Sequence, residues 1–374
     1  MKRFFSYTIL SFFLLLLPTG QASANNNDSI RLSLLTCAPG EEIYSLFGHT
    51  AIRYENPSQG IDIVFNYGLF SFNTPNFIFR FSLGETDYQL GATDYERFAA
   101  EYAFFGRSVW QQTLNLTDEE KTELIRLLQE NYRPENRVYR YNFFYDNCAT
   151  RPRDKIEESI AGKVIYPAEP QDGSLTFRDI VHQYCKGHPW ARFGIDLCIG
   201  SEADQPITQR QMMFAPFYLM DAFDGAQIKG DSIQRPLITA NELVVDATPE
   251  PDESDWMPTP LQCSLLLFIL TAAATIYGIR RRTGLWGIDL FLFGIAGIVG
   301  CVLAFLALFS QHPAVSSNFL LLVFHPGQLL FLPYIIYCVR KGKKCWYLTL
   351  NLAVLTLFIV LFPVIPQRFD FAVV

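Results

Sequence analysis

Four long apolar stretches in the last third of the chain constrain its fold more than any other feature. They cover residues 261–279, 286–309, 319–339 and 345–365. A helix rises 1.5 Å per residue, so each stretch can cross about 30 Å of hydrocarbon. Because a backbone in lipid must satisfy its own hydrogen bonds, the sequence predicts an all-α bundle of four transmembrane helices over residues 261–374.

The charges between these stretches predict their orientation. The first basic loop carries Arg280, Arg281 and Arg282, whereas the loop 310–318 has neither Lys nor Arg. A second basic loop, 340–344, has the sequence Arg-Lys-Gly-Lys-Lys. By the positive-inside rule both basic loops are cytoplasmic and 310–318 is external. The chain before residue 261 and the tail after 365 are then external as well.

The start of the chain supports the same topology. Lys2 and Arg3 precede an apolar run over 4–17 and the small residues Ala22-Ser23-Ala24, which is the pattern of a secretory signal peptide over 1–24. The run is short for a span, so we expect cleavage after Ala24, with an uncleaved anchor as the alternative. The expected location is the cytoplasmic (inner) membrane of a bacterial-type envelope, with the domain on the periplasmic or external side.

Between the two ends lies an exported domain, residues 25–243, followed by an acidic, proline-rich linker over 244–260. Ranges 30–36, 50–54, 61–67 and 109–116 have the composition of strands, whereas 94–104 and the segment opening at Thr117 have that of helices. Strands and helices do not alternate regularly, so the pattern favours an α+β domain with an antiparallel sheet. The net charge of −7 and the lack of external basic clusters argue against nucleic acid as a partner.

Two residues of the exported domain have the surroundings of catalytic groups. His49 follows Gly48 at the entrance of a predicted strand, and Cys148 lies in YNFFYDNCATRPRD. If Asp146 or Asn147 caps the next helix, the thiol lies in its first turn, where the helix dipole lowers the pKa of a cysteine nucleophile. The alternatives are an ordinary turn histidine and a buried structural cysteine.

Other residues compete for roles or support them. Cys37 is the rival nucleophile, although it ends a strand before a Pro-Gly turn and has no helix start to activate it. Asn66 is the candidate for orienting the His49 imidazole, with Asp62 second. Cys185 and Cys198 are close enough in sequence to form a local disulfide in an oxidising compartment.

The order of a strand histidine before an Asn-Cys pair resembles that of the permuted papain-like thiol enzymes of the NlpC/P60 group. A closer resemblance is to the Lnb-type lipoprotein N-acyltransferases. It is carried in the exported domain by LLTCAPGEEIYSLFGHTAIR, FNYGLFSFNTPNF, YNFFYDNCATRPRD and WARFGIDLCIGSEAD, and in the membrane part by HPAVSSNFLLLVFHPGQLLFLP. His325-Pro326-Gly327 departs from the family, in which Asn-Pro and an apolar residue are usual.

The resemblance implies an enzyme that moves an acyl chain onto the N-terminal cysteine amine of diacylglyceryl lipoproteins, its partners together with membrane lipid. Cys148 would carry the chain as a thioester, His49 would be the acid and base, and no metal or other cofactor would take part. Two alternatives remain. One is a cell-wall amidase or endopeptidase of the NlpC/P60 kind, and the other is a non-enzymatic envelope protein that binds a partner.

Further polar residues are expected to contact the substrate. His325 interrupts the third apolar stretch, and polar groups at such depth are costly and tend to be functional, although packing inside the bundle would also explain them. The full set predicted to bind substrate is Ser45, Asn147, His312, Asn318 and His325.

Overall fold

The computed structural model describes residues 30–73, 75–167, 175–230, 234–247 and 256–373. The predicted signal peptide lies outside these residues. The largest element of the exported domain is a seven-stranded, wholly antiparallel sheet in the order β10-β5-β1-β2-β3-β4-β6. The strands are β1 (Arg31–Cys37), β2 (His49–Asn56), β3 (Ile61–Leu69), β4 (Asp87–Asp94), β5 (Val109–Leu114), β6 (Val138–Arg140) and β10 (Ile238–Val245).

The strands alternate in the side chains that they present, so the sheet buries both of its faces. Leu32 and Leu34 of β1 pack in the larger core, whereas Leu35 of the same strand packs in a second core on the other face. The larger core is covered by α4 (Asp118–Tyr132), α5 (Thr150–Ser159) and α9 (Pro216–Asp224), and the second by α3 (Tyr95–Phe104). Thr117 opens α4 with the predicted capping box.

Smaller elements complete the domain, including α2 (Phe77–Leu83), α6 (Phe177–Tyr184), α7 (Pro189–Cys198), the 3-10 turn η3 (Ser201–Asp204) and α8 (Gln209–Met212). Three short strands, β7 (Lys163–Ile165), β8 (Gln227–Lys229) and β9 (Gln234–Pro236), form a separate sheet. The α+β class and the antiparallel sheet are therefore as predicted. The predicted linker starts too early, since its first two residues belong to β10.

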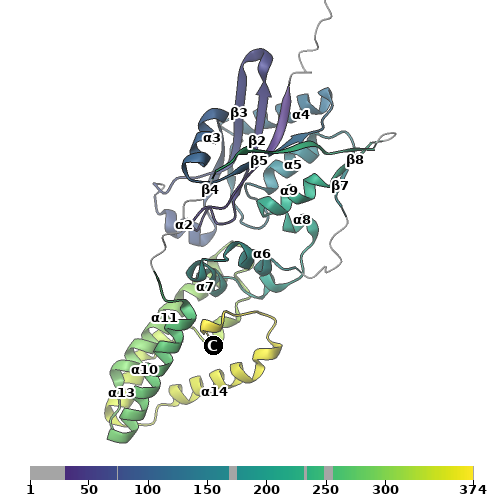
Figure 1. Ribbon diagram of the computed structural model, residues 1–374. Helices are drawn as coiled ribbons and strands as arrows, with labels where there is room; N and C mark the ends of the chain where they lie inside the picture. The colour runs from purple at the N-terminus through teal and green to yellow at the C-terminus, as the bar shows by residue number, and fades with distance from the viewer. Residues whose placement is uncertain (1–29, 74, 168–174, 231–233, 248–255, 374) are drawn as a thin grey trace, which may run out of the picture.

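The C-terminal region is helical. Three described helices are long and apolar enough to cross a membrane: α10 (Pro260–Arg281), α11 (Trp286–Phe309) and α14 (Trp346–Leu361, extended by a 3-10 turn to Val364). The third predicted span is broken into η4 (Phe319–Leu322), α12 (Gly327–Leu330) and α13 (Leu332–Lys341). The part Phe319–Leu330 and the part Leu332–Lys341 are bent by 71° relative to each other. If these two parts form one span, the number of candidate spans among the described residues is four. In Figure 1 these helices lie at one end of the molecule, and α14 diverges from the others.

The loop 310–318 docks on the exported domain. The backbone N–H of Gln311 donates to the Leu83 carbonyl at 2.8 Å, and the N–H of Gly200 donates to Ala314 at 2.6 Å. This is consistent with an external position for the loop, because it contacts the domain that is exported.

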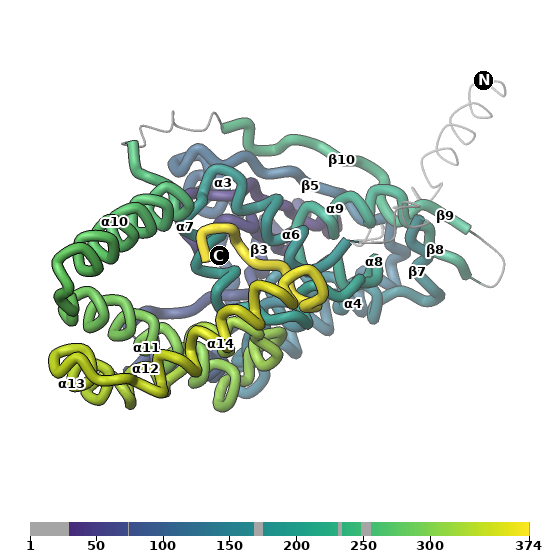
Figure 2. Tube along the Cα trace, turned by 90° about the horizontal axis from the view of Figure 1, so that it is seen from below, coloured from purple at the N-terminus to yellow at the C-terminus, as the bar shows by residue number. Residues whose placement is uncertain are grey.

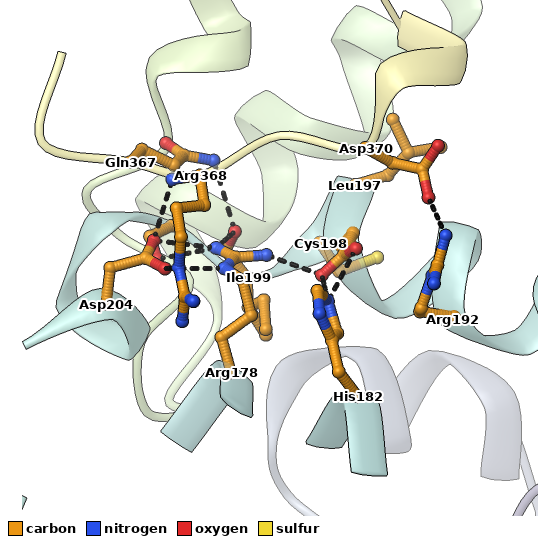
Figure 3. Close-up of polar contacts among 12 residues, drawn as sticks. Arg178, His182, Arg192, Leu197, Cys198, Ile199, Asp204, Gln367, Arg368 and Asp370 are labelled. Carbon is orange, nitrogen blue, oxygen red and sulfur yellow. Dashed lines mark hydrogen bonds and ion pairs between the residues drawn. The ribbon is translucent and has the colours of Figure 1, made fainter. Parts of the chain in front are cut away.

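The C-terminal tail docks on the same part of the domain. Viewed from below, the end of the chain lies beside α6 and α7 (Figure 2). Arg368 donates to Asp204 at 2.9 Å, and Asp370 pairs with Arg192 of α7 at 3.0 Å (Figure 3). Arg368 also donates to Asp179 of α6 at 2.6 Å. The tail thus joins the external end of α14 to the helices of the exported domain.

Beneath the tail lies a wholly buried arginine. Arg178 has no exposed surface, and its guanidinium donates to Asp196 at 2.6 Å and to Asp204 at 2.8 Å (Figure 3). It also donates to the carbonyl oxygens of Ile199 and Gly200. Because every one of these partners lies C-terminal to α6, the side chain holds α6, α7 and η3 together.

We predict that Arg178→Met lowers stability strongly, because it leaves Asp196 and Asp204 buried with fewer partners. The loss expected for breaking a buried pair is about 3–5 kcal/mol. Arg210 is the control, because it also pairs with two carboxylates, Asp154 and Glu157, but is about half exposed. Arg210→Met should cost about 0–1 kcal/mol. Thermal melts of the purified proteins in detergent measure the difference, and equal shifts would contradict the interpretation.

Candidate functional site

His49 and Asn66 form a pair on neighbouring strands. His49 begins β2, and its Nε2 lies 2.6 Å from the Oδ1 of Asn66 on β3. With an amide oxygen as the acceptor, Nε2–H is the donor, and Nδ1 is then the nitrogen free to accept a proton. Asp62, the second candidate for this role, instead receives two hydrogen bonds from Arg53.

The loop that carries Cys148 is built by Asn147. The Oδ1 of this buried side chain accepts from the N–H groups of Ala149 and Thr150, and its Nδ2 donates to the carbonyls of Phe143 and Phe214. All its polar atoms are therefore engaged by the protein itself. The sequence predicted that Cys148 lies in the first turn of the next helix. Because α5 begins only at Thr150, Cys148 instead lies just before the helix.

The side chains of Cys148 and His49 both approach Gly68. A Cβ built on Gly68 would lie 3.5 Å from the Cβ of Cys148 and 3.8 Å from the Cε1 of His49. The φ angle of +96° at Gly68 also favours glycine. In addition, the backbone N–H groups of Thr50 and of Cys148 bond to the sulfur. The fold therefore brings His49, Asn66 and Cys148 to one place.

Burial keeps both reactive groups neutral. Burial raises the pKa of the Cys148 thiol to about 11, although the two backbone N–H groups favour the thiolate. Burial lowers the pKa of His49 to about 4, although the hydrogen bond to Asn66 opposes this. The expected low thiol pKa is therefore not found, because desolvation outweighs whatever a nearby helix start contributes.

Cys37 lies directly opposite His49 in the register of β1 and β2 but has a different environment. It is wholly buried with Phe98 and Tyr102 of α3. Burial raises the pKa of its thiol to about 12, even though the Tyr102 hydroxyl donates to it. Cys37 is also absent from the lining of the cavity described next.

A large apolar cavity of about 1440 Å³ opens beside the thiol. Its lining includes His49, Gly68 and Cys148 at one end and residues of α11 such as Phe305 and Leu306 at the other. The lining also includes aromatic side chains of the segments 70–81 and 141–144, and Trp190 with smaller residues of α7. The cavity exceeds the volume of about 300–1,000 Å³ that is usual for small-ligand pockets, and it runs from the sheet to the spans.

The structure divides the residues predicted to bind substrate. His312 lines this cavity, and its Nε2 is bonded to the Phe81 carbonyl. Asn147 lines it too, although its polar atoms are occupied as described. Ser45 is buried, donates to the Glu42 carbonyl and does not line the cavity.

Asn318 and His325 are not part of the cavity lining either. Asn318 donates to the Leu197 carbonyl at 2.7 Å, so it ties the external loop to α7. His325 lies at the break in the third span, where its backbone packs against α11. A Cβ on Gly300 would lie 2.4 Å from the His325 nitrogen, so this glycine permits the close approach.

The predicted disulfide between Cys185 and Cys198 is absent, because both are free thiols. Cys185 caps α6 and is buried in the core beneath it, whereas Cys198 ends α7 and faces the large cavity. The short spacing in sequence predicted a disulfide, but the two cysteines lie at the ends of different helices with different surroundings.

Sequence reasoning missed two features of the site. Gly68 lies close to the side chains of both Cys148 and His49, and its only signal was a glycine that directly follows a strand-like run. The other is α7, whose Gly194 lines the cavity and has open space around it. No group of three or more His, Cys, Asp or Glu among the residues described here is arranged to hold a metal ion.

Comparison with known protein families gives two matches. The family model of the Lnb N-terminal periplasmic domain matches residues 20–182, and that of the Lnb transmembrane domain matches residues 252–374. The comparisons with curated proteins and with solved structures give no match. The resemblance inferred from the motifs and the periplasmic location of the N-terminal domain are thereby confirmed. The segment 183–251, which contains α7, lies outside both models.

We predict that alkylation of Cys148 in the folded protein accelerates about tenfold per pH unit and does not level off near 8.5, the ordinary cysteine pKa. The reason is that burial favours the neutral thiol, so the thiolate fraction keeps rising until the pH approaches about 11. Iodoacetamide labelling quantified on the Cys148 peptide by mass spectrometry measures the rate, with the denatured chain as control. A plateau below pH 8.5 in the folded protein would mean that the resting thiol is already activated.

Proposed function

Since the chain belongs to the Lnb family, which is an N-acyltransferase family, we propose that it transfers an acyl chain to the N-terminal cysteine amine of diacylglyceryl lipoproteins through a thioester on Cys148. The observation that carries the proposal is the apolar cavity that extends from Cys148 and His49 to α11. An acyl chain in this cavity would present its ester to the thiol while its tail points toward the spans.

In the first half-reaction Cys148 attacks the carbonyl carbon of a glyceryl ester. Because the thiol is neutral at rest, its proton passes to Nδ1 of His49 as the S–C bond forms. The C–O bond of the ester then breaks, and the imidazolium returns the proton to the departing glyceryl oxygen. The products are a lyso-glyceryl alcohol and the thioester of Cys148.

In the second half-reaction the lipoprotein amine attacks the thioester carbonyl. Its nitrogen loses a proton to His49, the C–S bond breaks and the sulfur takes the proton back, so an amide forms and the enzyme is restored. Asn66 would hold the imidazole in the tautomer that leaves Nδ1 free. The backbone N–H of Cys148 is a candidate donor to the oxyanion in both steps.

A cell-wall hydrolase would need a polar groove for a glycan or peptide. The lining of this cavity is instead rich in phenylalanine, tyrosine and aliphatic side chains, which suits an acyl chain. A structural role for the thiol would not require a neighbouring histidine and asparagine.

We predict that Cys148→Ser abolishes N-acylation, whereas Cys37→Ser keeps a good part of it, because Cys148 lines the cavity together with His49 and Cys37 does not. Asn66→Ala should lower kcat by about 10–100-fold with little change in KM, and Asp62→Ala, its control, should leave kcat nearly unchanged. Mass spectrometry of the N-terminus of a lipopeptide substrate measures each. If Cys37→Ser is dead and Cys148→Ser active, the nucleophile is Cys37.

A second prediction tests the position of the acyl chain. Gly194→Phe places a ring in the cavity, where nothing lies within 4 Å of the added Cβ. It should slow transfer from a lipopeptide with long acyl chains more than tenfold but spare one with butyryl chains. Gly287→Phe on α11 is the control, because Gly287 also has open space but lies outside the cavity. Equal loss with both substrates would place the chain elsewhere.

A further inference from the structure

The helix α2 has an unusual surface for a domain outside the membrane. Ile78 is 80% exposed and Phe79 is 57% exposed, and Phe81 is also exposed. Soluble surfaces rarely gather large apolar side chains in this way unless the patch is an interaction site. Nearby exposed residues of the same kind extend it, namely Ile43, Tyr44 and Phe72.

The polar side chains of α2 point elsewhere. Arg80 donates to the Glu85 carbonyl at 3.0 Å and pairs with Asp87 at 3.1 Å, so its charge is held against β4. The Ser82 hydroxyl donates to the Ile78 carbonyl within the helix. Helix α2 therefore has an apolar face without polar interruption.

The position of α2 relative to the spans decides what covers that face. The rings of Phe79 and Phe305 lie 5.8 Å apart, and Phe305 is in the last turn of α11. The end of α2 is fixed there, because Leu83 accepts from Gln311 just beyond α11. Since Phe305 lies four residues before the end of the span, α2 reaches about 6 Å inside it. That is the depth of about 5–10 Å at which interfacial helices lie in a bilayer.

We infer that α2 inserts into the outer leaflet of the membrane, with Ile78 and Phe79 among the lipid acyl chains. Its apolar face is continuous with the lipid-facing surface of α11, so one occupant, the bilayer, covers both. Because the same residues also line the large cavity, α2 is the partition between the lipid and the cavity. This contact does not depend on the proposed chemistry.

The test uses the full chain in phospholipid nanodiscs. Each of three variants carries one engineered cysteine at an exposed site in addition to the native cysteines. Ile78→Cys is compared with Tyr132→Cys, an exposed residue at the C-terminal end of α4, and with Ile269→Cys within α10. Each variant is treated with a charged, membrane-impermeant maleimide or with N-ethylmaleimide. Labelling of the engineered peptide is quantified by mass spectrometry, so the native cysteines do not interfere.

We expect the charged reagent to label Ile78→Cys at least about tenfold more slowly than Tyr132→Cys and close to the rate at Ile269→Cys. The neutral reagent should label Ile78→Cys readily. Equal labelling of Ile78→Cys and Tyr132→Cys by the charged reagent would overturn the inference. Should Ile78→Cys fail to fold, the wild-type chain is irradiated with a phospholipid that carries a diazirine in its acyl chain. Cross-linking to the peptide over 77–83 supports insertion, and its absence there refutes it.

Discussion

The buried guanidinium of Arg178 is the interaction on which the arrangement of domain and spans depends. A charge without solvent is tolerated only when its hydrogen bonds are satisfied, and here two carboxylates and two carbonyls do so. One of those carboxylates, Asp204, is shared with Arg368 of the C-terminal tail. The hydrogen bonds of Arg178 thus hold α7 and η3 together, and Asp204 also binds the C-terminal tail. Because α7 is also a wall of the cavity, the ionic cluster and the apolar cavity are two sides of the same helix.

The cavity explains the electrostatic state of the proposed catalytic pair. A thiolate and an imidazolium are stable in water, but both groups are buried beside an apolar cavity, which removes that water. Burial therefore raises the pKa of Cys148 and lowers that of His49, and the resting pair is neutral. In the proposed reaction, activation would come from the substrate, whose carbonyl would accept the electron pair as the proton moves. A neutral thiol is also less exposed to oxidation in a periplasmic compartment, since the thiolate is the reactive form.

Much of this could be predicted from the sequence because its signals are local. Span limits follow from runs of apolar residues, and α11 begins and ends at the predicted residues; the capping box at Thr117 follows from a four-residue pattern. Asn66 was identified as the partner of His49 because successive antiparallel strands are neighbours. The errors concern distant contacts. The sequence could not show that Asn147 delays the start of α5, that burial outweighs the helix dipole at Cys148, or that Cys185 lies in a core while Cys198 lines the cavity. Nor could it show that Asn318 serves α7 and not the cavity.

The same physical logic bears on how a thioester at Cys148 would be resolved. Water and an amine compete for such a thioester, and the outcome depends on which of them reaches its carbonyl. The lipoprotein is anchored in the bilayer, so its amine is delivered at the level of the membrane surface. Because the cavity reaches α11, an acyl chain in the proposed reaction would enter it from the bilayer and leave water little access to the thiol. A free α-amine has a pKa of about 7.7–8.0, so a substantial neutral fraction exists at neutral pH to attack the carbonyl. In the proposed reaction, an apolar cavity beside a neutral pair of His49 and Cys148 would therefore favour aminolysis over hydrolysis without any added group.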